Sequence, residues 1–255
     1  GCAGRQLICH WHCAVPHSRV SRTRWSCVLL DMDGTFFDFP ACERRAFFRT
    51  MQEFSIEADE DMYQRYRVVN KAAWKELEEG RLTHEQLRPE RFRRLMAQLG
   101  RTFPDGVTAE QVAAYNVQRI AEGDILYDGA RELWQRIYRQ YRVCVLTNGS
   151  DLTQYNRLKC AGLLEYTHAV VTSQRAGVGK PAAGIFQLAL AELGCPDKRE
   201  CVMVGDSLEA DIRGAENFGI DTIWYNPTKE RPKTMQVAKE VNDYSALALA
   251  LGLEK

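Results

Sequence analysis

The chain has 255 residues, of which 45% are hydrophobic and 27% charged, an ordinary composition for a globular protein that can bury a full core. Basic and acidic residues both number 34, and this balance argues against a general binder of nucleic-acid polymers. No apolar run approaches the about 20 residues that a membrane-spanning helix needs, so we expect no membrane partner. The length suits one domain with an insertion, or two small domains.

The first 25 residues differ in composition from the rest of the chain. They carry four arginines and no acid, whereas the remainder carries 30 bases and 34 acids. Paired cysteines and histidines at 9–13 have the ligand types of a zinc site, but no second pair follows them. A transit peptide is a second possibility, which the mid-segment Pro16 disfavours. We therefore predict that residues 1–25 are a disordered extension or a vector-derived remnant.

The nine cysteines predict no disulfide framework. An odd total without a pairing pattern indicates reduced thiols and hence a cytoplasmic protein. Cys144 and Cys201 lie in apolar runs, so we expect them to be buried as small hydrophobic residues.

Short apolar runs, each closed by polar or glycine residues, predict the buried strands of a parallel sheet. They cover 27–30, 143–146, 169–171, 201–204 and 222–225. Helical stretches lie between them, such as 185–193 with Gly194 after its end. This alternation predicts an α/β fold, a Rossmann-like sheet with helices on both faces.

Residues 40–120 break the alternation, because they contain no strand-like run. Thr83 and Gln86 have the spacing of a capping box, which marks the start of a helix. Gly80, Pro89, Gly100 and Pro104 punctuate the segment. Four amphipathic helices are predicted over 43–54, 59–79, 84–98 and 109–120. We therefore predict a core formed by 26–39 and 121–255, with a helical domain inserted at 40–120.

Carboxylates follow two of the predicted strands. Asp31 and Asp33 come directly after the first strand, and Asp206 and Asp211 follow the run at 201–204. In open α/β sheets, ligands bind at the carboxyl ends of the strands. Acids that converge there repel one another and are usually present to hold a cation, and oxygen ligands point to Mg²⁺. The alternative for Asp206 and Asp211 is the capped start of a helix.

Hydrogen-bond donors and a lysine accompany these acids. The Thr147 hydroxyl and the backbone amides of Asn148 and Gly149 follow another strand and suit phosphate oxygens. Lys180 precedes a helix and brings a positive charge. Each feature alone is most often a turn or a surface residue, but together they match phosphoryl transfer through an aspartyl-phosphate.

These motifs, in this order, resemble those of the haloacid dehalogenase (HAD) superfamily of aspartate-nucleophile phosphatases, and the helical insert resembles its cap. The resemblance covers about residues 26–250 and implies that Asp31 attacks phosphorus, while Asp33 serves as acid and base. It further implies a Mg²⁺ ion held by Asp31, Asp206 and the Asp33 backbone carbonyl, with Asp211 in support. Thr147 would orient the phosphoryl group and Lys180 would neutralise its charge.

The insert is similar to that of the pyrimidine-type 5′-nucleotidases, through Tyr66–Trp74, Gly80–Thr83 and Phe37–Phe39. The resemblance implies a small phosphate ester as substrate, namely a pyrimidine nucleoside monophosphate. Phe39 or Trp74 would stack on the base, although Trp74 is equally expected to pack between helices. Asn70 would face the nucleotide or only solvent.

Other activities and some departures from the family pattern stay open. A phosphatase or phosphomutase acting on a sugar phosphate is the main alternative, and a haloacid dehalogenase or an inactive binding protein is less expected. Gln174 stands where the family usually has an acid. Ala182 and Ala183 follow Lys180-Pro181, where an acid is also common. Both departures put supporting contacts to Lys180 in doubt. A monomer or a homodimer is expected.

Overall fold

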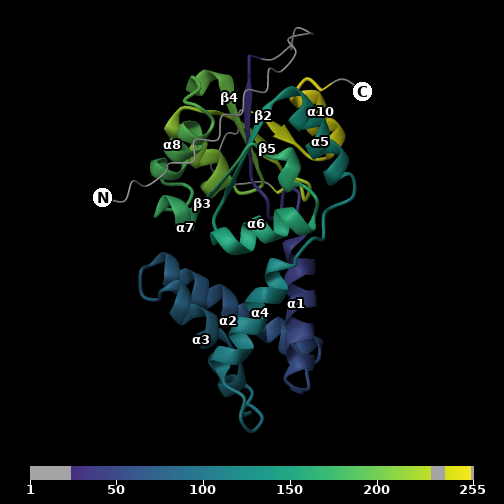
Figure 1. Ribbon diagram of the computed structural model, residues 1–255, viewed down its shortest axis with the longest axis vertical. Helices are drawn as coiled ribbons and strands as arrows, with labels where there is room; N and C mark the ends of the chain where they lie inside the picture. The colour runs from purple at the N-terminus through teal and green to yellow at the C-terminus, as the bar shows by residue number, and fades with distance from the viewer. Residues whose placement is uncertain (1–23, 231–238, 254–255) are drawn as a thin grey trace, which may run out of the picture.

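The computed structural model describes residues 24–230 and 239–253, in which an open sheet lies beside a separate bundle of helices (Figure 1). Within these residues the sheet has six strands, all parallel, in the order β3-β2-β1-β4-β5-β6. The strands are β1 (Cys27–Leu30), β2 (Arg142–Thr147), β3 (Ala169–Thr172), β4 (Cys201–Gly205), β5 (Asp221–Tyr225) and β6 (Glu240–Val241). Because β1 lies between β2 and β4, the carboxyl ends of these three strands are neighbours.

The predicted parallel sheet is confirmed. All five predicted strands are present, and their ends differ from the prediction by at most one residue. The sequence did not indicate β6, because two residues are too few to form a recognisable pattern.

Helices cover both faces of the sheet, because alternate residues of a strand face opposite sides. Val28 and Leu30 share one hydrophobic cluster with α5 (Ala130–Gln140) and α10 (Tyr244–Ala250). Cys27 and Leu29 share the opposite cluster with α8 (Ala183–Glu192) and α9 (Gly214–Phe218). The remaining elements of this part are α6 (Asp151–Cys160), α7 (Ser173–Ala176), the 3₁₀ turns Leu164–Tyr166 and Lys198–Glu200, and a π-helix at Leu208–Arg213.

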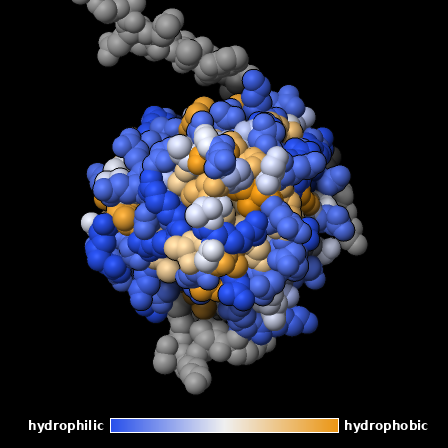
Figure 2. All heavy atoms as spheres, turned by 90° about the horizontal axis from the view of Figure 1, so that it is seen from below, coloured by the Kyte–Doolittle hydropathy of each residue, from blue (hydrophilic) through white to orange (hydrophobic). Residues whose placement is uncertain are grey.

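The second part of the fold is a bundle of four helices with its own hydrophobic core. One residue from each helix illustrates that core: Phe47, Tyr66, Phe92 and Val112 are all buried in a single cluster. The helices are α1 (Phe39–Glu53), α2 (Glu60–Glu78), α3 (His84–Gln98) and α4 (Ala109–Ala121). Viewed from the bundle end, the molecule has a largely hydrophilic rim, with apolar residues gathered nearer the middle (Figure 2).

Two details of the bundle refine the sequence prediction. Helix α1 begins at Phe39, four residues earlier than expected, because Asp38 accepts a hydrogen bond from the Ala41 amide and Pro40 suits the first turn. The predicted capping box of Thr83 is present at the start of α3. Pro89 lies inside α3, which continues through it over the predicted range 84–98.

The two chain segments that join sheet and bundle lie side by side. Phe37 and Leu126 form an antiparallel bridge, the Asp38 amide donates to the Ile125 carbonyl at 3.0 Å, and the Tyr127 amide donates to the Phe36 carbonyl at 3.0 Å. The chain therefore enters and leaves the bundle at adjacent points.

Several expectations concern composition rather than topology. The six cysteines among the described residues are free, and Cys144 and Cys201 are buried as expected. Within the same residues, no helix has both the length and the hydropathy needed to cross a bilayer. Most of the predicted extension, and with it the cysteines and histidines at 9–13, lies outside the described residues. The last two residues of the predicted extension are instead attached to the sheet, because Arg24 pairs with Asp221 at the start of β5 and Trp25 Nε1 donates to the same carboxylate.

Candidate active site

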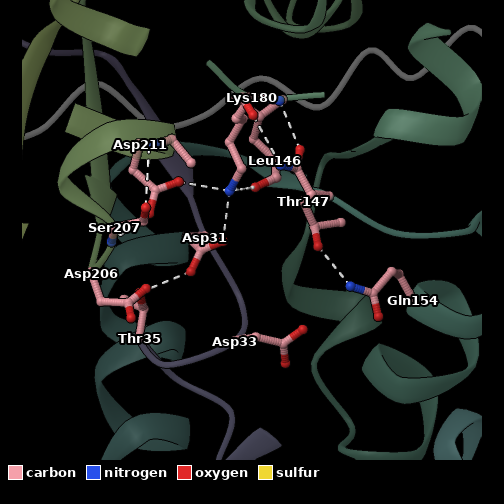
Figure 3. Close-up of polar contacts among 12 residues, drawn as sticks. Asp31, Asp33, Thr35, Leu146, Thr147, Gln154, Lys180, Asp206, Ser207 and Asp211 are labelled. Carbon is pink, nitrogen blue, oxygen red and sulfur yellow. Dashed lines mark hydrogen bonds and ion pairs between the residues drawn. The ribbon is translucent and has the colours of Figure 1, made fainter. Parts of the chain in front are cut away.

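The residues singled out at the strand ends meet at one edge of the sheet (Figure 3). Asp31 follows β1, Asp206 follows β4, and Asp211 comes from the π-helix beyond it. One oxygen from each of these three carboxylates lies within 4.8 Å of the others. The Thr35 hydroxyl, which lies 3.0 Å from Asp31 Oδ2 and 3.3 Å from Asp206 Oδ1, links two of them.

Burial and mutual repulsion raise the pKa values of two of these acids, Asp31 and Asp206. Burial raises the pKa of Asp31 well above its usual value, and the charge of Asp211 adds to the effect. The same two causes raise the pKa of Asp206 to about 6. Three oxygen ligands whose charges repel fit a hard divalent cation such as Mg²⁺, which would relieve the repulsion. The acids that the structure brings together therefore suit a metal site.

Lys180 provides the positive charge within this group. Its Nζ donates to Asp31 Oδ1 at 2.6 Å and to the Leu146 carbonyl at 2.8 Å, and it lies 2.7 Å from Asp211 Oδ1. Burial disfavours the charged ammonium, but the two carboxylates outweigh burial and raise the pKa of Lys180. The predicted meeting of lysine and nucleophile candidate is thus present in the structure.

Two glycines are required by the close approach of these carboxylates. A Cβ on Gly34 would collide with the Asp206 carboxylate, and Gly34 has a φ of +84°, which favours glycine. A Cβ on Gly205 would collide with the carboxylate of Asp211. The motif glycines therefore leave space for the acids rather than only forming turns.

Asp33 takes a different position from the other acids. Its carboxylate lies outside the group of three and pairs with Arg157, with Nη2–Oδ1 at 2.6 Å and Nη1–Oδ2 at 3.0 Å. The side chain of Arg157 is 1% exposed, whereas that of Asp33 is 32% exposed. Asp33 is therefore held by a buried partner while it reaches solvent in the cleft. The contribution of its backbone carbonyl to a metal remains a prediction.

The residues after β2 that were predicted to face a phosphate, Thr147, Asn148 and Gly149, have different surroundings in the structure. The Thr147 hydroxyl is buried and accepts a hydrogen bond from Gln154 Nε2 at 2.6 Å. The Asn148 side chain instead forms two hydrogen bonds with the backbone of Lys180: its Nδ2 donates to the Lys180 carbonyl, and its Oδ1 accepts from the Lys180 amide. Asn148 and Gly149 both line the cleft.

The departures from the family pattern have structural explanations. Gln174 Oε1 accepts a hydrogen bond from the Asp151 amide at 2.9 Å, so it caps the first turn of α6. Ala182 and Ala183 are exposed at the start of α8. Because Lys180 already has Asp31, Asp211 and the Leu146 carbonyl as partners, the missing acids do not leave it unpaired.

An open cleft of about 1380 Å³ lies between the sheet edge and the bundle. Its walls include Asp33 and Lys180 on one side and the three predicted bundle residues on the other: Phe39, Asn70 and Trp74. Trp74 is 36% exposed and contacts the His84 ring edge-on, so it is not enclosed between helices. The Phe39 ring packs against Arg157, whose guanidinium carbon lies 5.2 Å from the ring centre.

Asn70 belongs to a buried polar network that joins the bundle helices. Its Nδ2 donates to Glu43 Oε1 at 2.7 Å, and its Oδ1 accepts from Arg91 Nη1 at 3.1 Å. Arg91 Nη2 also donates to Asn116 Oδ1, and Asn116 donates to the Thr50 hydroxyl, both at 3.1 Å. We call these five residues the bundle network. Asn70 is thus neither free in solvent nor fully available to a ligand.

Comparison with known families agrees with this geometry. The family model for a haloacid dehalogenase-like hydrolase matches residues 25–219. The chain belongs to this family. It is therefore a HAD hydrolase, and its named relatives are consistent with the phosphoric monoester hydrolase class.

Two curated relatives and one solved structure illustrate the kinship. The pyrimidine 5′-nucleotidase PynA of Streptococcus pneumoniae is 35% identical over 86% of this chain and 92% of its own length. The pyrimidine 5′-nucleotidase YjjG of Escherichia coli is 31% identical over 82% of this chain and 90% of its own length. The structure of the HAD-hydrolase YfnB from Bacillus subtilis, bound to magnesium, superposes with a TM-score of 0.80 at 28% identity, covering 90% of this chain and 99% of that chain.

Sequence reasoning missed Gln154 and Arg157. Both lie on α6, three residues apart, and therefore share a helix face. A lone glutamine and arginine in an amphipathic helix are usually solvent-facing, so only their spacing relative to Thr147 could have indicated them.

Proposed function

We propose that this protein is a Mg²⁺-dependent phosphatase that hydrolyses nucleoside 5′-monophosphates, with a preference for pyrimidines, through an aspartyl-phosphate on Asp31. The observation that carries the proposal is the meeting of Asp31, Asp206, Asp211 and Lys180 at the edge of a large cleft. The insert at 40–120, as a cap over this edge, would supply the substrate-selecting wall.

The chemistry follows from the positions of the side chains. An Asp31 oxygen attacks phosphorus, the bond to the ester oxygen breaks, and Asp33 gives its proton to the departing alkoxide. Asp33 then takes a proton from water, which attacks the phosphorus of the acyl phosphate. Inorganic phosphate is released, the Asp31 carboxylate is regenerated, and Asp33 is protonated for the next cycle.

Lys180 and the three clustered carboxylates would provide the electrostatic environment for this reaction. Lys180 contacts the Asp31 carboxylate at 2.6 Å, so its positive charge lies where the phosphoryl oxygens would arrive. Asp31, Asp206 and Asp211 would hold Mg²⁺, together with the Asp33 backbone carbonyl. When bound, that cation supplies positive charge that allows a dianionic phosphate to approach a carboxylate.

The nucleotide preference rests on the cleft and on the relatives. Trp74 and Phe39 present aromatic surface on the bundle side, opposite Lys180, where a base attached to a bound phosphate would reach. PynA and YjjG, which match most of this chain, are named as pyrimidine 5′-nucleotidases.

The test is a substrate panel assayed with Mg²⁺. Nucleoside monophosphates, sugar phosphates and p-nitrophenyl phosphate are compared by kcat/KM, with phosphate release as the readout. We expect pyrimidine nucleotides to lead the panel. Sugar phosphates ahead by a wide margin would overturn the nucleotide preference, and conversion of a hexose 1-phosphate with little phosphate release would indicate a mutase.

A bundle variant tests the base contact. Trp74→Ala is expected to raise KM for a pyrimidine nucleotide about tenfold, the order of one lost stacking contact, and to leave p-nitrophenyl phosphate unchanged. Leu249→Ala, at an exposed apolar residue of α10, is the matched control. An equal change for both substrates in Trp74→Ala would show that Trp74 acts on the fold and not on the base.

A further inference from the structure

Helix α6 carries a chain of hydrogen-bonded side chains that joins residues from two strand ends. Arg157 holds both oxygens of Asp33, and its Nη1 also donates to Gln154 Oε1 at 3.0 Å. Gln154 Nε2 in turn donates to Thr147 Oγ1 at 2.6 Å (Figure 3). We call Asp33, Arg157, Gln154 and Thr147 the α6 relay. It connects the acid that follows β1 with the hydroxyl at the end of β2.

The chemistry of the groups fixes the direction of each hydrogen bond in the relay. A guanidinium only donates, so Gln154 must turn its carbonyl oxygen toward Arg157 and its amide nitrogen toward Thr147. The Thr147 hydroxyl then accepts from Gln154. Its own proton is consequently left to donate to another group, and an oxygen of a bound phosphoryl group is the acceptor that the proposed reaction supplies.

Burial keeps the relay in one arrangement. Gln154 is 4% exposed and Arg157 is 1% exposed. The Arg157 guanidinium carbon lies 4.9 Å from the centre of the Phe37 ring, and its Nε donates to the Gly123 carbonyl at 3.3 Å. Because Arg157 is buried and contacts Phe37 and Gly123 as well as Asp33, these partners favour the orientation in which it holds both oxygens of the Asp33 carboxylate.

We infer that Gln154 and Arg157 are positioning residues for the reaction, an inference that rests on the proposed phosphatase function. Arg157 orients the Asp33 carboxylate toward the ester oxygen in the cleft. Gln154 keeps the Thr147 hydroxyl as a donor to the phosphoryl group. Neither residue belongs to the motifs on which the sequence resemblance rests.

The two residues are expected to have different kinetic signatures. Asp33 matters in the first step only when the leaving group needs a proton, which an alkoxide does and p-nitrophenolate does not. Thr147 acts on the phosphoryl group, which every substrate shares. Loss of Arg157 should therefore discriminate between substrates, and loss of Gln154 should not.

The first experiment compares kcat/KM for ribose 5-phosphate, which keeps the alkoxide leaving group but has no base to contact Phe39, with kcat/KM for p-nitrophenyl phosphate on the same enzyme sample. We expect Arg157→Met to lower the ratio of the two about tenfold or more, and Arg157→Lys to restore part of it. Because both values share one enzyme concentration, an unfolded fraction cancels in the ratio. Lys159→Met, on the exposed side of α6, should keep the wild-type ratio.

The outcomes separate this inference from the proposed function. A wild-type enzyme that hydrolyses both substrates supports the phosphatase function, and an unchanged ratio in Arg157→Met then overturns the role of Arg157 alone. A wild-type enzyme that hydrolyses neither overturns both.

The second experiment is a double-mutant cycle between Gln154→Met and Thr147→Val. If Gln154 acts through Thr147, each single variant lowers kcat/KM for both substrates by a similar factor, about tenfold, and the double variant is no worse than Thr147→Val. Independent, multiplying effects would overturn the role of Gln154. Thermal unfolding of each variant identifies any loss that comes from misfolding.

Discussion

Two buried polar groups in this molecule solve the problem of buried charge in opposite ways. At the sheet edge, three carboxylates lie together and two of them, Asp31 and Asp211, contact the Lys180 ammonium, so negative charge is in excess. In the bundle network, one carboxylate and one guanidinium are joined through amide side chains, and the charges balance. The proposed cation and anionic substrate would complete the first group, whereas the second has its partners within the protein.

The difference also shows in what each group gives to stability. The sheet-edge acids have raised pKa values, so folding without a cation places them in an unfavourable environment. Burial also raises the pKa of Glu43 in the bundle network, but there the Arg91 charge and the Asn70 hydrogen bond oppose the shift, and the network fixes the relative positions of four helices. Changes at the two sites should therefore separate activity from stability.

The largest expected effect is at the nucleophile. Asp31→Asn should lower kcat by about 10⁴-fold or more, because the amide cannot form the acyl phosphate. The free energy of unfolding, measured with urea in the absence of Mg²⁺, should stay the same or rise, because a repelled carboxylate is removed. A variant that keeps substantial turnover would contradict Asp31 as the proposed nucleophile.

The bundle network should respond in the opposite sense. Arg91→Met leaves Glu43 buried without its compensating charge, and we expect a loss of about 3 kcal/mol in the free energy of unfolding. Glu43→Gln keeps the hydrogen-bonding shape and should lose less. Urea unfolding measures both, and kcat for p-nitrophenyl phosphate should change little in either. A larger loss for Glu43→Gln would show that the network does not balance charge as described.

Geometry at the sheet edge can be tested without removing a charge. Gly205→Ala drives a methyl group into the Asp211 carboxylate, which pairs with Lys180, and should lower kcat/KM by about 100-fold. Gly184→Ala in α8 is the control, because its Cβ would meet only the exposed side chain of Val178. Equal activity in the two variants would mean that the position of Asp211 is not critical.

The smallest effect concerns pH and magnesium. The pKa of Asp206 is raised from 3.8 to about 6, so its contribution to the stability of the metal-free protein is present below pH 3.8 and is lost as pH rises through 6. Mg²⁺ competes with that proton, so the rise in Tm that it causes should grow by a few degrees across this window. Sodium chloride at equal ionic strength should not reproduce the rise. A magnesium effect independent of pH would exclude Asp206 as a ligand.

The strands and the strand-end acids were predictable because both have local signals. A short apolar run closed by polar residues predicts a buried strand, and the ends of β1, β2 and β4 then follow from parallel order. The start of α1 was predicted late, because the signal there is a cap, Asp38, and an early proline rather than a hydrophobic period.

The partners of the predicted residues were less accessible from sequence. Nothing local distinguishes Arg157 from a solvated arginine, since its partner Asp33 lies 124 positions earlier in the chain. Gln174 was interpreted as a lost acid near the lysine, but it caps α6 instead. Asn70 was expected at the nucleotide or in solvent, and the structure engages its amide in the bundle network while it lines the cleft.

The paired segments at Phe37 and Leu126 have a consequence for how such a protein can change over generations. Because the helical unit leaves and rejoins the sheet at adjacent points, it can be lengthened, shortened or exchanged without rerouting any strand. Substitutions that alter which molecule fits the cleft can then accumulate on one side of this junction, while the carboxylates at the strand ends on the other side keep their relative positions.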